Sequence, residues 1–163
     1  MEQSILKTKS LIISLIQFLV VLGIIILAQI IFKNQFITGT IINTLLISSV
    51  VFLGLRQSLG IAIIPSLFSV VTGLMAPVLL PFVPFIILGN IILILTFNYF
   101  KDKNFLFGGI LGSFLKFGFL FLLSSQLFAF LPAPILYAMS YPQLITALSG
   151  TFLSFILLKI FKK

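Results

Sequence analysis

The sequence contains no cysteine and no histidine, and its only acidic residues are Glu2 and Asp102. The absence of cysteine excludes disulfides and thiolate chemistry. Metal centres and paired carboxylate catalysts need clusters of His, Cys, Asp or Glu, and this chain has too few to build one. The nucleotide-binding motif G-x-x-x-x-G-K-[ST] is also missing. We therefore expect a protein that is not an enzyme, holds no metal ion or cofactor and does not hydrolyse ATP by that route.

Charge of either sign is scarce, whereas apolar residues dominate. Of the 163 residues, 61% are hydrophobic and 7% are charged, against roughly 25% charged residues in a soluble domain. This composition predicts an integral membrane protein. The apolar runs are long and do not alternate with polar residues, which favours membrane-spanning helices over strands.

Polar or turn-rich breaks divide the chain into six hydrophobic segments. We predict an all-α polytopic membrane protein in which residues 1–163 form a single transmembrane domain. The first apolar run, from Leu11 to Phe32, exceeds the roughly 7–15 apolar residues of a signal peptide and lacks a clear cleavage site, so we expect a retained helix. The predicted helices span residues of about 11–32, 38–54, 58–75, 84–100, 105–126 and 142–160.

The formal net charge of +8 is explained by membrane topology better than by nucleic-acid binding. With the N-terminus inside, the outer connections carry only Lys33. The positive-inside rule then predicts a multi-pass protein of the cell (plasma) membrane with both termini in the cytoplasm. The predicted inner face carries Lys7, Lys9, Arg56, Lys101, Lys103, Lys159, Lys162 and Lys163.

Two predicted outer connections are uncharged and rich in proline and aromatic residues: "APVLLPFVP", which ends at Pro84, and "LPAPILYAMSYP", which ends at Pro142. One interpretation is that they fold down over the helices and pack there. The other is that they lie at the level of the lipid headgroups, with Tyr137 and Tyr141 as interfacial anchors. The residues leave both interpretations open.

Small residues recur at helical spacing and predict close contacts between helices. Such seams most often serve plain helix packing. The three seams are Gly108 and Gly112; Ser66, Ser69 and Gly73; and Gln143, Thr146, Gly150 and Ser154.

Lys116, within "GSFLKFGFLFLL", is the strongest candidate for a functional residue. If its helix begins near Phe105, eleven residues at 1.5 Å each place it about 16 Å from the inner end, close to mid-membrane. An unpaired cation there costs several kcal/mol, and no membrane carboxylate exists to pair with it. We expect it to meet a backbone carbonyl, an amide, water, or an anionic or carbonyl-bearing ligand. The alternative is that "FLFGGILG" forms an interfacial turn, which would place Lys116 near the inner surface.

Amide side chains within the apolar segments are the next candidates. Asn43 and Asn90 each have donors and an acceptor to satisfy, and such groups usually hydrogen-bond across helices. We predict that structural role for Asn43, whereas Asn90 follows an outer connection and is a credible ligand contact. Gln17 and Gln29 on the first helix are weaker cases of the same kind.

Several short segments, taken in order, resemble the substrate-binding S components of energy-coupling factor (ECF) transporters, the vitamin importers of bacteria and archaea. The resemblance covers the chain from the second helix to its end. The segments are "FITGTIINTLL" (Phe36 to Leu46), "IPSLFSVVTGLMAP" (Ile64 to Pro77), "PFIILGN" (Pro84 to Asn90), "FLKF" (Phe114 to Phe117) and "YPQLITALSG" (Tyr141 to Gly150).

The resemblance implies six helices, a ligand pocket near the outer face, and docking on a transmembrane coupling subunit attached to two ABC-type ATPases. By this analogy the site draws on Asn90, Lys116 and the outer end of the sixth helix, and we predict Lys116, Asn90, Gln143 and Asn43 as the ligand-binding residues. The family often carries A-x-x-x-A on its first helix, and this pattern is absent here. Gly23 and Ala28 are small but at the wrong spacing, whereas Ser10 and Ser14 have the right separation.

Three functional hypotheses follow. The leading one is a substrate-binding subunit of an ATP-driven importer of a vitamin-like micronutrient, which captures its ligand at the outer face. Its partners would be a small molecule, the coupling subunit, the ATPases and the lipid bilayer, but no nucleic acid. The alternative is a non-catalytic structural or assembly subunit of a membrane complex. A lipid-modifying enzyme is disfavoured by the shortage of catalytic groups.

Overall fold

The computed structural model describes residues 2–75, 77–127 and 133–161, and within these ranges the chain is helical and contains no strand. This confirms the predicted all-α class. The elements in chain order are α1 (Glu2–Ile31), α2 (Gln35–Phe52), α3 (Leu55–Val71), the 3-10 helix η1 (Pro77–Phe82), α4 (Val83–Phe100), α5 (Phe105–Leu127), α6 (Ala133–Ala138) and α7 (Tyr141–Phe161).

The predicted segments correspond to the long helices, and the largest differences are at the start of α1 and the end of α3. Helix α1 begins at Glu2, upstream of the apolar run that predicted it. Helix α3 ends at Val71 rather than near residue 75, because Gly73 adopts a positive φ of 69° that interrupts the helix. The short helix α6 lies in a connection for which no helix was predicted.

Among the described residues, five helical segments are long and apolar enough to cross a membrane. They are Lys9–Ile31 within α1, Gln35–Phe52 (α2), Pro77–Phe100 (η1 and α4), Phe105–Gln126 within α5 and Leu136–Phe161 (the end of α6 and α7). Helix α3 is also apolar but has 17 residues, about 26 Å at 1.5 Å per residue, against a hydrocarbon core of about 30 Å. It also contains Pro65. The structure is therefore compatible with a multi-pass membrane protein.

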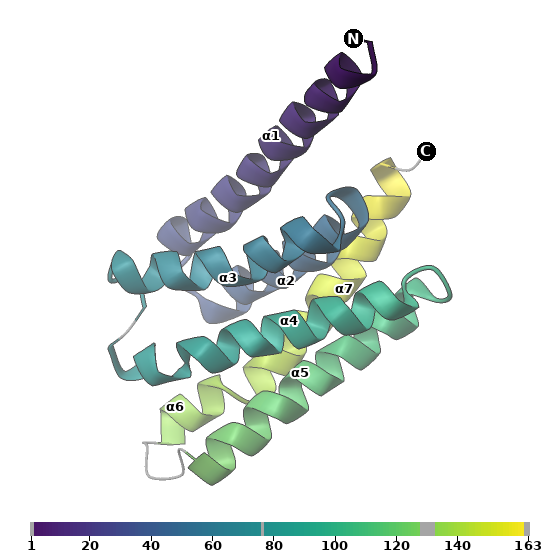
Figure 1. Ribbon diagram of the computed structural model, residues 1–163. Helices are drawn as coiled ribbons and strands as arrows, with labels where there is room; N and C mark the ends of the chain where they lie inside the picture. Colours follow the sequence, from purple (N-terminus) through teal and green to yellow (C-terminus); the bar gives the residue numbers. More distant parts are fainter. Residues whose placement is uncertain (1, 76, 128–132, 162–163) are drawn as a thin grey trace.

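Helix α2 is central to the bundle, since it packs on α1, α3, α4 and α7. Helix α5 packs on both α4 and α7, which completes the bundle on the opposite side (Figure 1). The start of α1 and the end of α7 lie at the same end of the molecule, together with the α2–α3 and α4–α5 connections (Figure 1). We call this the termini end, and the opposite end, with the α1–α2 and α3–α4 connections, the loop end.

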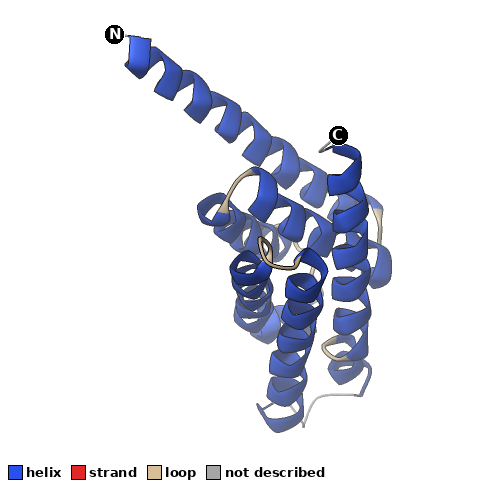
Figure 2. Ribbon diagram, turned by 90° about the vertical axis from the view of Figure 1, so that its right-hand side faces the viewer, coloured by secondary structure: helices blue, strands red, loops and turns tan. Residues whose placement is uncertain are grey.

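Helix α1 leans away from the other helices toward its N-terminus (Figure 2). Its apolar residues are accordingly exposed on several sides, as shown by Leu11 at 70% and Leu15 at 52%. Closer to the loop end the helix joins the bundle, where Ile25 and Ala28 are buried. An apolar surface of this extent is expected where the surrounding medium is lipid.

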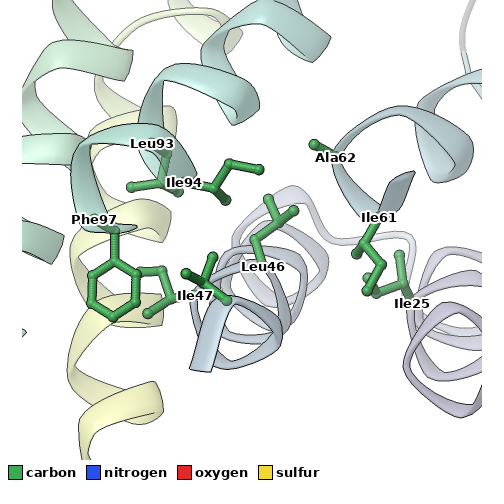
Figure 3. Close-up of a cluster of buried hydrophobic side chains, with 9 residues drawn as sticks. Ile25, Leu46, Ile47, Ile61, Ala62, Leu93, Ile94 and Phe97 are labelled. Carbon is green, nitrogen blue, oxygen red and sulfur yellow. The ribbon is translucent and has the colours of Figure 1, made fainter. Parts of the chain in front are cut away.

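The apolar core is centred on α2 and includes side chains of α1, α3 and α4 (Figure 3). Leu46 and Ile47 of α2 face side chains of α4, while Ile61 of α3 lies next to Ile25 of α1 (Figure 3). The fully buried cluster consists of Ile25, Leu46, Ile47, Val50, Ile61, Ala62, Leu93, Ile94 and Phe97.

Two of the predicted small-residue seams form close helix contacts. A Cβ at Gly112 would lie 2.9 Å from the carbonyl oxygen of Leu93 on α4, so α5 can approach α4 only because this residue has no side chain. A Cβ at Gly150 would lie 2.6 Å from the Cβ of Asn43 on α2, and Ser154 hydrogen-bonds across the same interface to Ser48 at 2.9 Å.

The two uncharged connections agree in part with each interpretation: some of their residues pack on the helices, and others are exposed. Phe82 of η1 and Met139 after α6 are buried, at 1% and 2% exposure, so these segments pack against the helices. Tyr137 and Tyr141 are more than half exposed, as interfacial anchors would be. Residues 76, 131 and 132 of the two connections lie outside the described residues.

The contact of α7 with α2 predicts different outcomes for two glycine substitutions. Gly150→Ala should lower the free energy of unfolding by about 1–3 kcal/mol, because the added methyl group overlaps Asn43 and Thr44. Gly118→Ala is the matched control, since nothing lies within 4 Å of its added Cβ, and alanine favours the helix by up to about 1 kcal/mol. Thermal unfolding of both variants in one detergent measures the difference in stability. Equal destabilisation would contradict a close contact of α7 with α2 at Gly150.

Candidate ligand-binding site

Lys116 lies in the middle of an uninterrupted helix. Helix α5 begins at Phe105, so Lys116 is about 16 Å from its start, as the sequence predicted. The side chain is buried, with 2% of its surface exposed. Because "FLFGGILG" is part of the same helix, the alternative of an interfacial turn is wrong.

Two asparagine amides hold the ammonium group. Lys116 Nζ donates to Oδ1 of Asn43 at 2.7 Å and to Oδ1 of Asn90 at 2.8 Å. The three residues come from α5, α2 and α4 respectively. Gly89 precedes Asn90 and packs against the lysine stem, since a Cβ there would lie 3.4 Å from Lys116 Cγ, in ordinary van der Waals contact.

Asn43 also connects α2 to α7. Its Nδ2 donates to the carbonyl oxygen of Gly39 at 2.8 Å and to Oγ1 of Thr146 at 3.3 Å. These bonds fix the amide so that Oδ1 faces the ammonium group. The cross-helix role predicted for Asn43 is thus present, and the site involves four helices.

Neither acidic residue of the chain is placed near Lys116. Asp102 is exposed in the α4–α5 connection at the termini end, and Glu2 stands at the start of α1. The partners that the described chain offers the cation are therefore neutral amide oxygens. An ammonium group has three N–H donors, and two of them are used by the asparagines.

A cavity of about 620 Å³ borders this cluster on the side nearer the loop end. All four residues singled out in the sequence line it: Lys116, Asn90, Gln143 and Asn43. Its wall continues through the ends of α1 and α3 and the starts of α2 and α4. The volume is within the range of about 300–1,000 Å³ that small-molecule pockets occupy.

Gln143 contributes to the cavity indirectly as well. Its Nε2 donates to the carbonyl oxygen of Ala138 at 3.4 Å, and Nε2 of Gln35 donates to the same oxygen at 2.9 Å. These bonds attach the end of α6 to α2 and α7, next to Met139 in the cavity wall. The end of α6 is thereby held against the loop end of the cavity.

Three residues contribute more to this wall than their spacing in the sequence indicates. Ser66 and Ser69 were interpreted as a packing seam, yet both are buried in α3 and line the cavity. Gln29 was treated as a weak case, yet it lines the cavity and its Oε1 is buried with no hydrogen-bond partner among the described residues. The seam spacing identified the correct helix face, but spacing alone does not distinguish a packed face from a cavity wall.

No family model matches this chain, and no curated protein or solved structure shows significant similarity to it. The resemblance to S components therefore stays a prediction based on the short segments quoted above. What the site can do has to be argued from its own geometry. That geometry is a buried cation with neutral partners, facing a cavity large enough for a small molecule.

The hydrogen bonds of Asn43 predict that its side chain contributes strongly to the stability of the protein. Asn43→Ala should lower the free energy of unfolding by about 1–3 kcal/mol, because Lys116 loses one of its two acceptors while buried. Ser48→Ala on the same helix removes a single hydroxyl bond to Ser154 and should cost only about 1 kcal/mol. Thermal unfolding of the purified variants measures the difference, and a Ser48 effect as large as that of Asn43 would contradict this ranking.

Proposed function

We propose that this chain is a ligand-binding subunit of a membrane importer that takes up a small, vitamin-like molecule with an anionic or carbonyl group. The ligand enters the cavity from the loop end, which corresponds to the outer face, and its acceptor group meets Lys116. In this proposal both termini are cytoplasmic. The chain acts without catalysis and delivers its ligand by docking on a coupling subunit that carries separate ATPases.

The observation that carries the proposal is the buried ammonium group at the inner end of an open cavity. A lysine kept only for structure gains most from a carboxylate partner, because an ion pair offsets the cost of burying the charge. Here the partners are neutral and one N–H remains available. Such an arrangement leaves the positive charge to be neutralised by a bound anion or carbonyl dipole.

The proposed role in an importer rests on groups that the sequence lacks and on its resemblance to S components. Its membrane segments carry no acidic residue for proton coupling, and a phosphate-binding loop is missing. Energy for uptake would then come from partner ATPases. The resemblance to S components points the same way and supplies the expected partner, a transmembrane coupling subunit.

The second candidate is a structural or assembly subunit that binds no ligand. One observation favours this structural role. The hydrogen bonds of Lys116 to Asn43 and Asn90 connect α5 to α2 and α4 and would stabilise the bundle without a ligand. In that case Lys116 would contribute to stability alone.

Asn90→Asp separates the two functions. The substitution places a carboxylate where Lys116 Nζ already lies 2.8 Å from the amide oxygen, so the charge is neutralised within the chain and the fold should be retained. A ligand anion then meets a carboxylate, and its affinity should fall at least about tenfold. Lys116→Met should weaken binding similarly, whereas Lys103→Met, at the exposed α4–α5 connection, should change nothing.

Native mass spectrometry of the purified protein measures these outcomes, together with co-purification of partner subunits from the source membrane. We expect a small molecule bound to the unaltered chain and to Lys103→Met, and its loss from Asn90→Asp and Lys116→Met. Absence of any bound molecule together with absence of ATPase partners would overturn the proposal in favour of the assembly role. The assembly role also follows if Lys116→Met changes only the unfolding temperature.

A further inference from the structure

The cavity has hydrogen-bond donors available at its inner end. Lys116 uses two of its three N–H groups on the asparagine oxygens. Asn90 accepts through Oδ1, and its Nδ2 donates to no residue in the described part of the chain. Both side chains line the cavity. A carboxylate, phosphate or carbonyl group placed there can therefore accept hydrogen bonds from two adjacent donors.

The cavity also has an acceptor without a partner, on a different helix. Oε1 of Gln29 on α1 is buried and, within the described residues, makes no hydrogen bond. Gln29 lines the same cavity as Lys116. A buried amide oxygen without a donor is rare in native proteins and destabilising. Rotation of the terminal amide of Gln29 would bring Oε1 from the wall to a donor group on a ligand in the cavity.

The wall between these two positions is mostly apolar. It includes Ile42 of α2, Ile61, Ala62 and Pro65 of α3, and Ile86 of α4. Ser66 lies on this wall with 7% exposure, and its hydroxyl has no partner in the segments that the structure describes. The cavity therefore has a donor-rich inner end, an apolar body and an acceptor on α1.

We propose that the ligand is polar at two ends: an anionic or carbonyl group accepts from Lys116 and Asn90, and an N–H or O–H group donates to Gln29 Oε1. Gln29 is then a specificity-determining residue that selects molecules with this second group. The proposal rests on the proposed function, because it requires that the cavity bind a small molecule. A ligand of this kind would also connect α1, which packs on α2 and α3, to α4 and α5.

The test uses the full chain, purified in detergent, and a panel of small hydroxy and amino acids of up to about 20 non-hydrogen atoms. Each compound is paired with the same acid lacking the hydroxyl or amino group and with its methyl ester. Dissociation constants and shifts of the unfolding temperature are measured for the unaltered chain, Gln29→Met, Lys116→Met and Gln57→Met. Gln57 is the matched control, because its Oε1 is also buried without a partner but it does not line this cavity.

We expect the unaltered chain to bind the two-ended acids about tenfold or more tightly than the acids lacking the donor group. Gln29→Met should abolish this preference and leave binding of the simple acids unchanged. Lys116→Met should abolish the preference for acids over esters. Gln57→Met should keep the binding preferences of the unaltered chain and unfold at a lower temperature, because it loses the hydrogen bond from Nε2 to Ser14 Oγ. Without any compound, Gln29→Met should unfold at the same or a higher temperature, because it removes an unpaired buried acceptor.

The outcomes distinguish this inference from the function on which it rests. If acids bind through Lys116 but the donor group and Gln29→Met make no difference, the two-ended ligand is wrong and the proposed function stands. If no compound of the panel binds and no molecule is found on the purified protein, the proposed function fails and the inference with it. A preference that persists in Gln29→Met but is lost in Gln57→Met would also overturn the inference.

Discussion

The positive charge of Lys116, held mid-helix without a carboxylate, is the constraint on which the rest of the structure depends. In a lipid environment the ammonium group cannot remain unsolvated, since that costs several kcal/mol. The chain meets this requirement with Oδ1 of Asn43 and Oδ1 of Asn90. Because these amides come from α2 and α4, three helices must meet at one height for the charge to be accommodated. The interaction therefore fixes the relative position of the helices as well as the chemistry of the cavity.

The helices can meet at this height because glycines allow them to approach one another closely. Gly112 brings α5 onto α4, because a Cβ there would overlap the carbonyl oxygen of Leu93. Gly39 and Gly150 do the same for α2 and α7, which places Thr146 within reach of Asn43. Hydrocarbon provides little hydrophobic driving force between helices, so packing and cross-helix hydrogen bonds have to hold the bundle together. Here both are concentrated around the site.

The cluster borders both the apolar core and the cavity, which share Ile61 and Ala62 of α3. Toward the termini end, the residues one turn beyond the asparagines are Leu46 and Leu93, which belong to the fully buried apolar core. Toward the loop end lies the cavity, with the unpaired oxygen of Gln29. Unsatisfied polar groups destabilise a protein, and a well-packed region elsewhere can offset that cost where function requires it. This distribution of packed apolar residues on one side of the cluster and polar groups in the cavity wall on the other agrees with the binding role proposed above.

The sequence alone determined the all-α class and the position of the buried cation along the chain. Scarce charge and long apolar runs predicted the long helices, since lipid requires every backbone group to be satisfied inside a helix, although α1 begins nine residues before its predicted start. Residue inventory showed that Lys116 had no acidic partner. These are local or compositional properties, which a single sequence contains in full. The end of α3 at Val71 and the helix α6 were missed because they depend on turn geometry.

Only the tertiary structure decided which polar residues meet. Asn43 and Lys116 are far apart in sequence, and periodicity gives the face of each helix but not its rotation or height relative to another. For the same reason Ser66 and Gln29 could not be recognised as cavity residues from their spacing, although both lie on the wall that leads to Lys116. Whether a small polar face packs on a neighbour or borders an open space depends on where the other helices stop. That is a property of the assembled bundle, which no single segment contains.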